Sequence, residues 1–170
     1  MNNNVKMNFV VFLDVDGVLN TKRTCANAPS GMPVGIDEAR VNILSKAMRE
    51  NGADGVILTT TWKDLREDNE DYIYLVQSLN KYNIGILGKT EDDRWSQREE
   101  GVLKYLKLHP EIEEFVILDD RHFGFKNYCK IWENFIDTQG RGIEHSIAAS
   151  KTPSISAILF IDAIKKYAKN

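Results

Sequence analysis

Two aspartates stand two positions apart in the segment FLDVDGVLN, directly after a run of apolar residues. Asp14 follows the apolar run, Asp16 comes two residues later, and Gly17 comes next. Carboxylates this close repel each other, and a cation between them relieves the repulsion. Oxygen ligands favour a hard ion such as Mg²⁺, and Gly17 permits a sharp turn that brings backbone amides near a bound anion. The segment therefore indicates a magnesium and phosphate site, with a solvated acidic turn as the alternative.

The same segment does not fit the calcium loop of an EF-hand. Such a loop carries its glycine at the sixth position and a glutamate at the twelfth. Counted from Asp14, the glycine stands fourth and the twelfth position is Cys25.

Two later apolar runs also end in polar residues. GVIL is followed by Thr59, and FVIL is followed by Asp119 and Asp120. In an open parallel sheet, ligands bind at the carboxyl ends of the strands. We therefore expect these three residues and Asp14 to meet in one crevice.

Short apolar runs alternate with helical patterns along the whole chain. Strands are expected at 8–14, 55–59, 84–87, 115–118 and near 135–138, and helices after Asp37, over 69–80, after Ser96 and from 152–153. This alternation predicts an α/β fold, a three-layer Rossmann-like and mostly parallel sheet with helices on both faces.

Two of the expected helices carry more detailed signals. In the helix over 69–80, Ile73, Val76 and Leu79 are expected to form the buried side. Ser96 and Glu99 match a capping box, which places a helix start ahead of the next apolar stripe.

The composition is that of an ordinary globular protein. Of 170 residues, 42% are hydrophobic and 28% are charged, which excludes a disordered chain. No apolar run exceeds five residues, against about 18 for a membrane span. The length predicts one domain over residues 1–170, with Asn20–Ile36 as a flap loop.

Cysteine usage bears on location. Cys25 and Cys129 are in no CxxC-type spacing, and the N-terminus has no signal-peptide pattern. We interpret both as reduced thiols of a cytoplasmic protein.

The segment FLDVDGVLN resembles the first motif of the haloacid dehalogenase (HAD) superfamily, in its phosphatase branch. ILTTTWK resembles the second motif, which ends a strand in Thr or Ser, and FVILDDR resembles the fourth, a strand that ends in paired acids. Between them, REEGVLKYL begins a helix where the superfamily places a basic residue. The resemblance spans about Phe9 to Asp120. Its finer pattern is similar to small capless members, including polynucleotide 3′-phosphatases, RNA-polymerase tail phosphatases and the domain of multifunctional RNA-repair proteins.

The resemblance implies a mechanism. Asp14 would be the nucleophile that forms an aspartyl-phosphate, and Asp16 would protonate the leaving oxygen and then deprotonate water. Mg²⁺ would bridge Asp14, the backbone carbonyl of Asp16, Asp120 and a phosphate oxygen. Asp119 would orient the site or bind through water.

The second motif supplies candidate phosphate ligands. Thr59 is the preferred hydroxyl because it is the first polar residue after VIL, with Thr60 and Thr61 as competitors. Thr60, Lys63 and the Gly17 backbone are further substrate-binding candidates. Close relatives more often carry arginine where Lys63 stands, so a bidentate fork would be missing, and a lysine in solvent is the alternative.

The basic residue of the third motif is assigned to Arg98. Its side chain starts near a helix N-terminus, which favours anions. Lys89 and Arg94 in the preceding loop are alternatives, and a surface ion pair with a neighbouring glutamate is the competing interpretation of Arg98.

Neither gap between the motifs has room for a large cap domain, so we expect an open active-site mouth. An open mouth suits a phosphate on a bulky substrate, such as an RNA or DNA end. A basic rim suited to phosphodiester backbones is expected from Lys22, Arg23, Lys63, Arg66 and Arg121. The competing hypotheses are a phosphatase of phosphoproteins or small esters, and a non-catalytic or receiver-like binding module. No membrane partner is expected.

Overall fold

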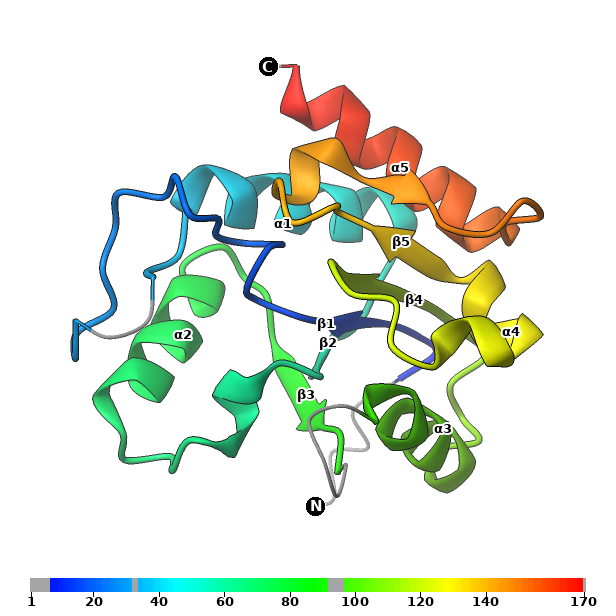
Figure 1. Ribbon diagram of the computed structural model, residues 1–170, viewed down its shortest axis with the longest axis horizontal. Helices are drawn as coiled ribbons and strands as arrows, with labels where there is room; N and C mark the ends of the chain where they lie inside the picture. The colour runs from blue at the N-terminus through cyan, green and yellow to red at the C-terminus, as the bar shows by residue number, and fades with distance from the viewer. Residues whose placement is uncertain (1–6, 32–33, 92–96, 170) are drawn as a thin grey trace.

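A six-stranded sheet runs through the centre of the molecule, and the computed structural model describes residues 7–31, 34–91 and 97–169. The strands are β1 (Phe9–Leu13), β2 (Gly55–Leu58), β3 (Ile86–Lys89), β4 (Glu114–Asp119), β5 (Phe135–Asp137) and β6 (Ile147–Ala148). The helices are α1 (Glu38–Asn51), α2 (Glu70–Asn80), α3 (Arg98–Leu108), α4 (Cys129–Glu133) and α5 (Ile155–Ala168) (Figure 1). Short 3-10 turns are η1 (Thr61–Asp64), η2 (Phe125–Asn127) and η3 (Ile143–His145).

The strand order is β3-β2-β1-β4-β5-β6. Every pairing from β3 to β5 is parallel, and only the short β6 runs antiparallel to β5. The chain extends the sheet from β1 to one side, then returns across it and continues on the other side with β4. The carboxyl ends of β1 and β4 therefore lie at the point where the strand order reverses, which is where ligands bind in such sheets. The predicted α/β fold is confirmed.

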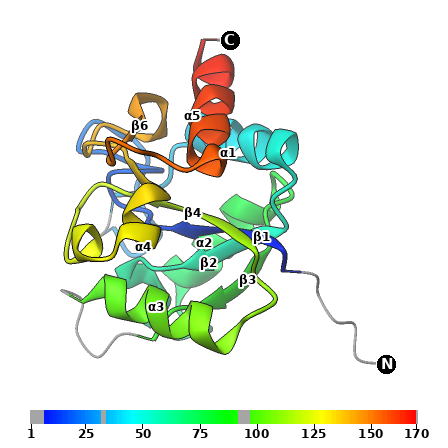
Figure 2. The same ribbon diagram turned by 90° about the vertical axis from the view of Figure 1, so that its right-hand side faces the viewer.

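The sheet separates two hydrophobic layers. Successive strand residues point to opposite faces, so Val11 and Leu13 join the core under α1, α2 and α5. Val10 and Phe12 join the core under α3 and α4. Figure 2 shows α1 and α5 on one side of the sheet and α3 and α4 on the other. Cover on both faces explains why β1 is a continuous apolar run rather than an alternating one.

The third strand begins two residues later than predicted, at Ile86 instead of Ile84. The Ile84 N–H donates to the Leu79 carbonyl, 3.1 Å away, and the Asn83 backbone adopts a positive φ of 59°. The backbone of Ile84 is thus part of the turn that ends α2, so the strand starts after it.

The predicted apolar side of α2 is only partly the buried one: Leu79 is buried and Val76 packs against the core, but Ile73 is exposed. Tyr72, Leu75 and Leu79 are buried, whereas Ile73 is 42% exposed. Residues 72–76 are all apolar, so the helical period alone allows either face. The face that is buried packs into the core on one side of the sheet. Next to it, the Ser30 N–H and hydroxyl donate to the Asp71 carboxylate at 3.0 and 2.6 Å and join the flap to the helix.

Two other helices, α3 and α5, differ from the prediction at their first turns. The predicted capping residue Ser96 lies outside the described residues, and α3 begins at Arg98 after Gln97, whose side chain makes no capping hydrogen bond. The last helix begins at Ile155 rather than at 152–153, because the Ser154 hydroxyl accepts the Ala157 N–H at 3.1 Å and is the N-cap.

The segment between β1 and α1 is a loop in its described parts, 20–31 and 34–36. It is pinned to α2 by the Ser30–Asp71 contacts and by the Ile36 N–H, which donates to the Tyr74 hydroxyl at 3.0 Å. Among the described residues, no element forms a separate cap over the sheet. No helix in the described chain is long and apolar enough to cross a membrane.

Two adjacent residues of α5 test the layer arrangement. Phe160 is fully buried and Leu159 is 54% exposed. Phe160→Ala should lower the free energy of unfolding by about 3–5 kcal/mol, because it leaves a cavity under the sheet. Leu159→Ala should change it by less than about 0.5 kcal/mol. Urea denaturation followed by circular dichroism measures both, and equal losses would contradict the assigned helix face.

Candidate active site

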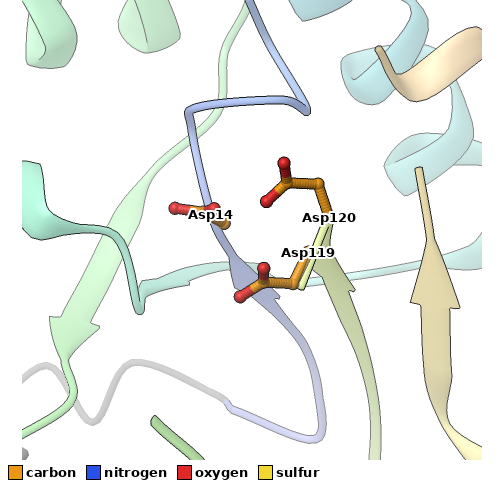
Figure 3. Close-up of side chains that lie close together, drawn as sticks. All are labelled: Asp14, Asp119 and Asp120. Atoms are coloured by element: carbon orange, nitrogen blue, oxygen red, sulfur yellow. The ribbon is translucent and has the colours of Figure 1, made fainter. Parts of the chain in front are cut away.

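Strand pairing brings the predicted carboxylates together. Leu13 pairs with Leu118 in β4 and with Leu58 in β2, so Asp14 emerges between Asp119 and Thr59. The Asp14 N–H donates to the Leu118 carbonyl at 2.9 Å, which continues the ladder one residue beyond β1. Carboxylate oxygens of Asp14, Asp119 and Asp120 all lie within 4.8 Å of one another. Figure 3 shows these side chains at the ends of the two neighbouring strands.

Arg98, the first residue of α3, bridges two of these carboxylates. Its Nη1 lies 2.9 Å from Asp14 Oδ2 and 2.7 Å from Asp119 Oδ2. The Phe123 ring lies 4.9 Å from the guanidinium carbon, and the arginine side chain is buried. A buried ion pair replaces the expected alternative of a surface pair with a neighbouring glutamate. Of the other basic candidates, Lys89 lies 4.2 Å over the Tyr72 ring, and Arg94 lies outside the described residues.

The pKa values follow from burial and from this bridge. Burial raises the pKa of Asp14, and Arg98 opposes the rise. Burial and the nearby Asp14 charge raise the pKa of Asp119 well above its usual value. Burial lowers the pKa of Arg98, but the attraction of the two aspartates outweighs it and the pKa is raised. Burial also raises the pKa of Asp120, against the attraction of Arg121. Three carboxylates therefore face the guanidinium groups of Arg98 and Arg121, and the remaining negative charge favours a cation.

Unpartnered buried atoms point to where a cation and an anion fit. Asp14 Oδ1 and Thr59 Oγ1 are buried and have no hydrogen-bond partner among the described residues. Buried polar atoms normally have partners, so such exceptions call for an explanation. Asp119 is fully engaged, because Oδ2 contacts Arg98 and Oδ1 accepts the Arg121 N–H at 2.9 Å. The donor set of carboxylate oxygens fits a hard divalent ion.

Asp16 lies at the exposed side of the site and outside the carboxylate cluster. Its Oδ1 accepts the Asn20 amide at 2.9 Å, and its Oδ2 accepts the Trp62 indole N–H at 3.2 Å. Sequence reasoning missed both partners as site residues. The signal for each was position alone, because Asn20 closes the first motif and Trp62 follows the threonines of the second.

Gly17 turns the chain at the edge of the cluster. Its φ is +82°, and a Cβ placed there would lie 2.5 Å from Asp120 Oδ2, so the site requires glycine. The Gly17 N–H donates to Asn20 Oδ1 at 3.2 Å, and its carbonyl accepts the Thr138 hydroxyl at 2.8 Å. Thr138 is a third residue that sequence reasoning missed; it lies directly after β5.

A cavity of about 310 Å³ opens above the cluster. Among the residues that line it are Asp14, Asp16, Gly17, Arg98 and Asp120. The cavity therefore brings together residues from both acidic motifs and from the start of α3.

The residues of the second motif differ from one another in whether they reach the cavity. Thr61 lines the cavity, whereas the buried Thr60 accepts the Trp62 N–H at 3.4 Å as the N-cap of η1. Lys63 is not among the described lining residues; it is only 8% exposed and its Nζ lies 2.9 Å from Asp64 Oδ1. The alternative of a lysine in solvent is therefore wrong.

The family model for the HAD domain in Swiss Army Knife RNA repair proteins matches residues 10–146. The chain belongs to this family. The matched range contains both acidic motifs, Arg98 and the loop around Gly140, and the family is one of phosphate-ester hydrolases in general terms. A search of curated proteins finds no match. The resemblance inferred from FLDVDGVLN and FVILDDR is confirmed.

The Arg98 bridge can be tested by stability. Arg98→Met should lower the free energy of unfolding by about 3–5 kcal/mol, because it leaves two buried carboxylates without their cation. Arg66→Met is the matched control: the Arg66 side chain is 83% exposed beside Asp68, and its loss should cost less than about 1 kcal/mol. Chemical denaturation measures the free energy of unfolding of both variants. A decrease for Arg98→Met as small as that for Arg66→Met would contradict the bridge.

Proposed function

We propose that the chain is a Mg²⁺-dependent phosphatase that acts through an aspartyl-phosphate on Asp14. The arrangement of Asp14 carries the proposal: one carboxylate oxygen is held by Arg98, and the other is buried without a hydrogen-bond partner in the described chain, in a cluster that includes Asp120. A nucleophile needs this combination of fixed orientation and a free lone pair. Asp14 reaches it at the carboxyl end of a central strand, so the fold positions it without a mobile loop.

The proposed ion is held by Asp14, Asp120 and the backbone carbonyl of Asp16, with Asp119 fixing the orientation of the site through Arg98. When bound, Mg²⁺ supplies positive charge that offsets the repulsion between the carboxylates and the phosphate dianion.

The chemical steps belong to two aspartates. Asp14 attacks the phosphorus, the bond to the leaving oxygen breaks, and Asp16 donates its proton to that oxygen. Water then attacks the phosphorus of the aspartyl-phosphate and gives a proton to Asp16, and Asp14 regains its carboxylate. The Asn20 and Trp62 hydrogen bonds suit this exchange, because they orient Asp16 while its exposed position leaves it accessible to substrate.

Hydroxyl and backbone groups complete the phosphate site in this proposal. The Thr59 hydroxyl has no partner in the described chain and follows β2, the strand paired with β1, so it donates to a phosphate oxygen. Thr60 and Gly17 shape the two loops that flank the cavity. Lys63 contributes charge from behind the threonines rather than a direct contact with the phosphate.

The substrate class follows from the family and from the open site. We infer a phosphorylated RNA or DNA end, because the described chain places no cap over the cavity and the family is that of RNA-repair HAD domains. We also propose that residues 1–170 act as one domain in the cytoplasm, since Cys25 and Cys129 are exposed free thiols, as is typical of a reducing compartment.

Asp14→Asn should abolish phosphate release from p-nitrophenyl phosphate while the circular dichroism spectrum stays that of the wild type. Asp68→Asn is the control, because Asp68 is exposed and pairs only locally with Arg66. Magnesium should raise the melting temperature of the wild type and of Asp68→Asn, since it binds only the folded state, and EDTA should reverse the rise. Substantial turnover by Asp14→Asn would exclude it as the nucleophile.

Asp16→Asn tests the general acid through the leaving group. On a sugar phosphate, whose leaving oxygen needs a proton, kcat should fall by about 10²–10⁴-fold. The fall should be much smaller on p-nitrophenyl phosphate, because nitrophenolate departs without a proton. Trp62→Phe, which removes one hydrogen bond to Asp16, should show the same pattern to a lesser degree. Equal losses on both substrates would contradict the assigned role.

A further inference from the structure

A second and larger cavity adjoins the catalytic one. Its volume is about 750 Å³, and Lys22, Asp120 and Arg121 line both cavities, so the two are continuous. Five of its lining side chains are lysine or arginine, and two are carboxylates. The cavity is therefore cationic next to a site that is itself acidic.

One of these five cations is neutralised. Arg40 forms a bidentate ion pair with Glu144, with Nη2–Oε1 at 2.8 Å and Nε–Oε2 at 3.0 Å. Lys22, Arg23 and Arg121 are in no such pair within the described parts of the chain. Arg141 contacts the neutral Gln139 amide, so it also keeps its charge. Four cations of the cavity lining therefore form no ion pair within the described chain, although Arg121 attracts the neighbouring Asp120.

The walls that carry these cations are held in place. Arg40 Nη1 donates to the Thr21 and Thr24 hydroxyls at 3.4 and 3.3 Å, which ties down the turn that bears Lys22 and Arg23. On the opposite wall, the Gly142 N–H donates to the Gly17 carbonyl at 3.1 Å and fixes the loop that bears Arg141. A wall that is already ordered binds a charged ligand at lower entropic cost.

We propose that this second cavity binds the phosphodiester backbone of a strand whose terminal phosphate lies against Asp14. The proposal rests on the proposed function and adds a subsite for the next phosphate along the chain. Arginine recognises phosphate oxygens through paired N–H donors, and the second cavity presents Arg23, Arg121 and Arg141.

The predicted basic rim is thereby revised. Lys22, Arg23 and Arg121 line the second cavity as expected of a rim. Lys63 and Arg66 are not among the described residues that line it; they pair with Asp64 and Asp68. Arg141 lines the cavity instead, and it was not predictable as part of the rim because it lies far along the chain from Lys22, Arg23 and Arg121.

A polyanionic strand fits this cavity better than a phosphopeptide does. A peptide backbone is neutral, so a phosphopeptide presents only the charge of its one phosphate to the four cations. Each phosphodiester of a nucleic acid carries a charge, and its cationic contacts make binding salt-dependent.

The test uses trinucleotides with natural linkages or with uncharged methylphosphonate linkages, each made with a 3′ or a 5′ terminal phosphate. Binding to Asp14→Asn protein with Mg²⁺ is measured by fluorescence anisotropy, and hydrolysis by wild type as kcat/KM. The natural trinucleotide of the preferred end should bind at least tenfold more tightly than its methylphosphonate form. In the Arg23→Gln/Arg141→Gln variant this ratio should approach one, and the slope of log Kd against log salt should fall by about 1.4, or 0.7 for each lost contact to a single strand.

Arg49→Gln/Lys107→Gln is the matched control. These exposed residues lie near the far ends of α1 and α3, whose first turns are at the catalytic edge, and their loss removes the same charge. This control should keep the preference for natural linkages. If the Asp14→Asn protein binds the natural and the methylphosphonate trinucleotides equally tightly, the subsite is overturned. A serine phosphopeptide that binds as tightly as the natural trinucleotide would also overturn it. Absence of hydrolysis of any ester would defeat the proposed function alone, because the binding measurements still decide the subsite.

Discussion

The contact between Arg98 and two buried aspartates is the interaction on which the site depends. Asp14 and Asp119 end neighbouring strands, and both lose nearly all contact with water. Without a cation between them, their repulsion and desolvation would oppose the pairing of the strands that carry them. Arg98 enters from the start of α3, so the helix that covers one face of the sheet also supplies the charge that its edge requires. The same contact orients one oxygen of Asp14 and leaves the other free.

The fold was predictable from sequence because its main signals are strong and local. Continuous apolar runs that end in acids marked β1 and β4, and the alternation of strands with helices implied parallel pairing. The failures came where the local pattern allows two answers. Tyr72, Ile73 and Leu75 are all apolar, and the buried face is the one that packs into the core on one face of the sheet, which local sequence does not specify. Ile84 looks like a strand residue, but a hydrogen bond to the end of α2 takes its N–H.

The site was predictable in its acids and less so in their supports. Asp14, Asp119 and Asp120 follow from strand ends, and their convergence is a consequence of sheet order. Asn20 holds Asp16 from four residues away within the same turn, whereas Trp62 reaches it from 46 residues along the chain, and no residue spacing encodes that second contact. The same limit applies to Arg141, since only the folded chain brings its loop to the glycine turn after β1.

The continuation of the β1–β4 ladder past Leu13 has a consequence for how this protein would lose function. Asp14 and Asp119 sit on rigid, paired backbone, so their separation is set by strand alignment rather than by loop motion. A slip of one strand by two residues would preserve the inward and outward alternation of side chains yet displace the acids by about 6.6 Å, since each residue advances about 3.3 Å. Because β1 and β4 are buried on both faces, the spacing of these two carboxylates reports directly on the alignment of the central strands.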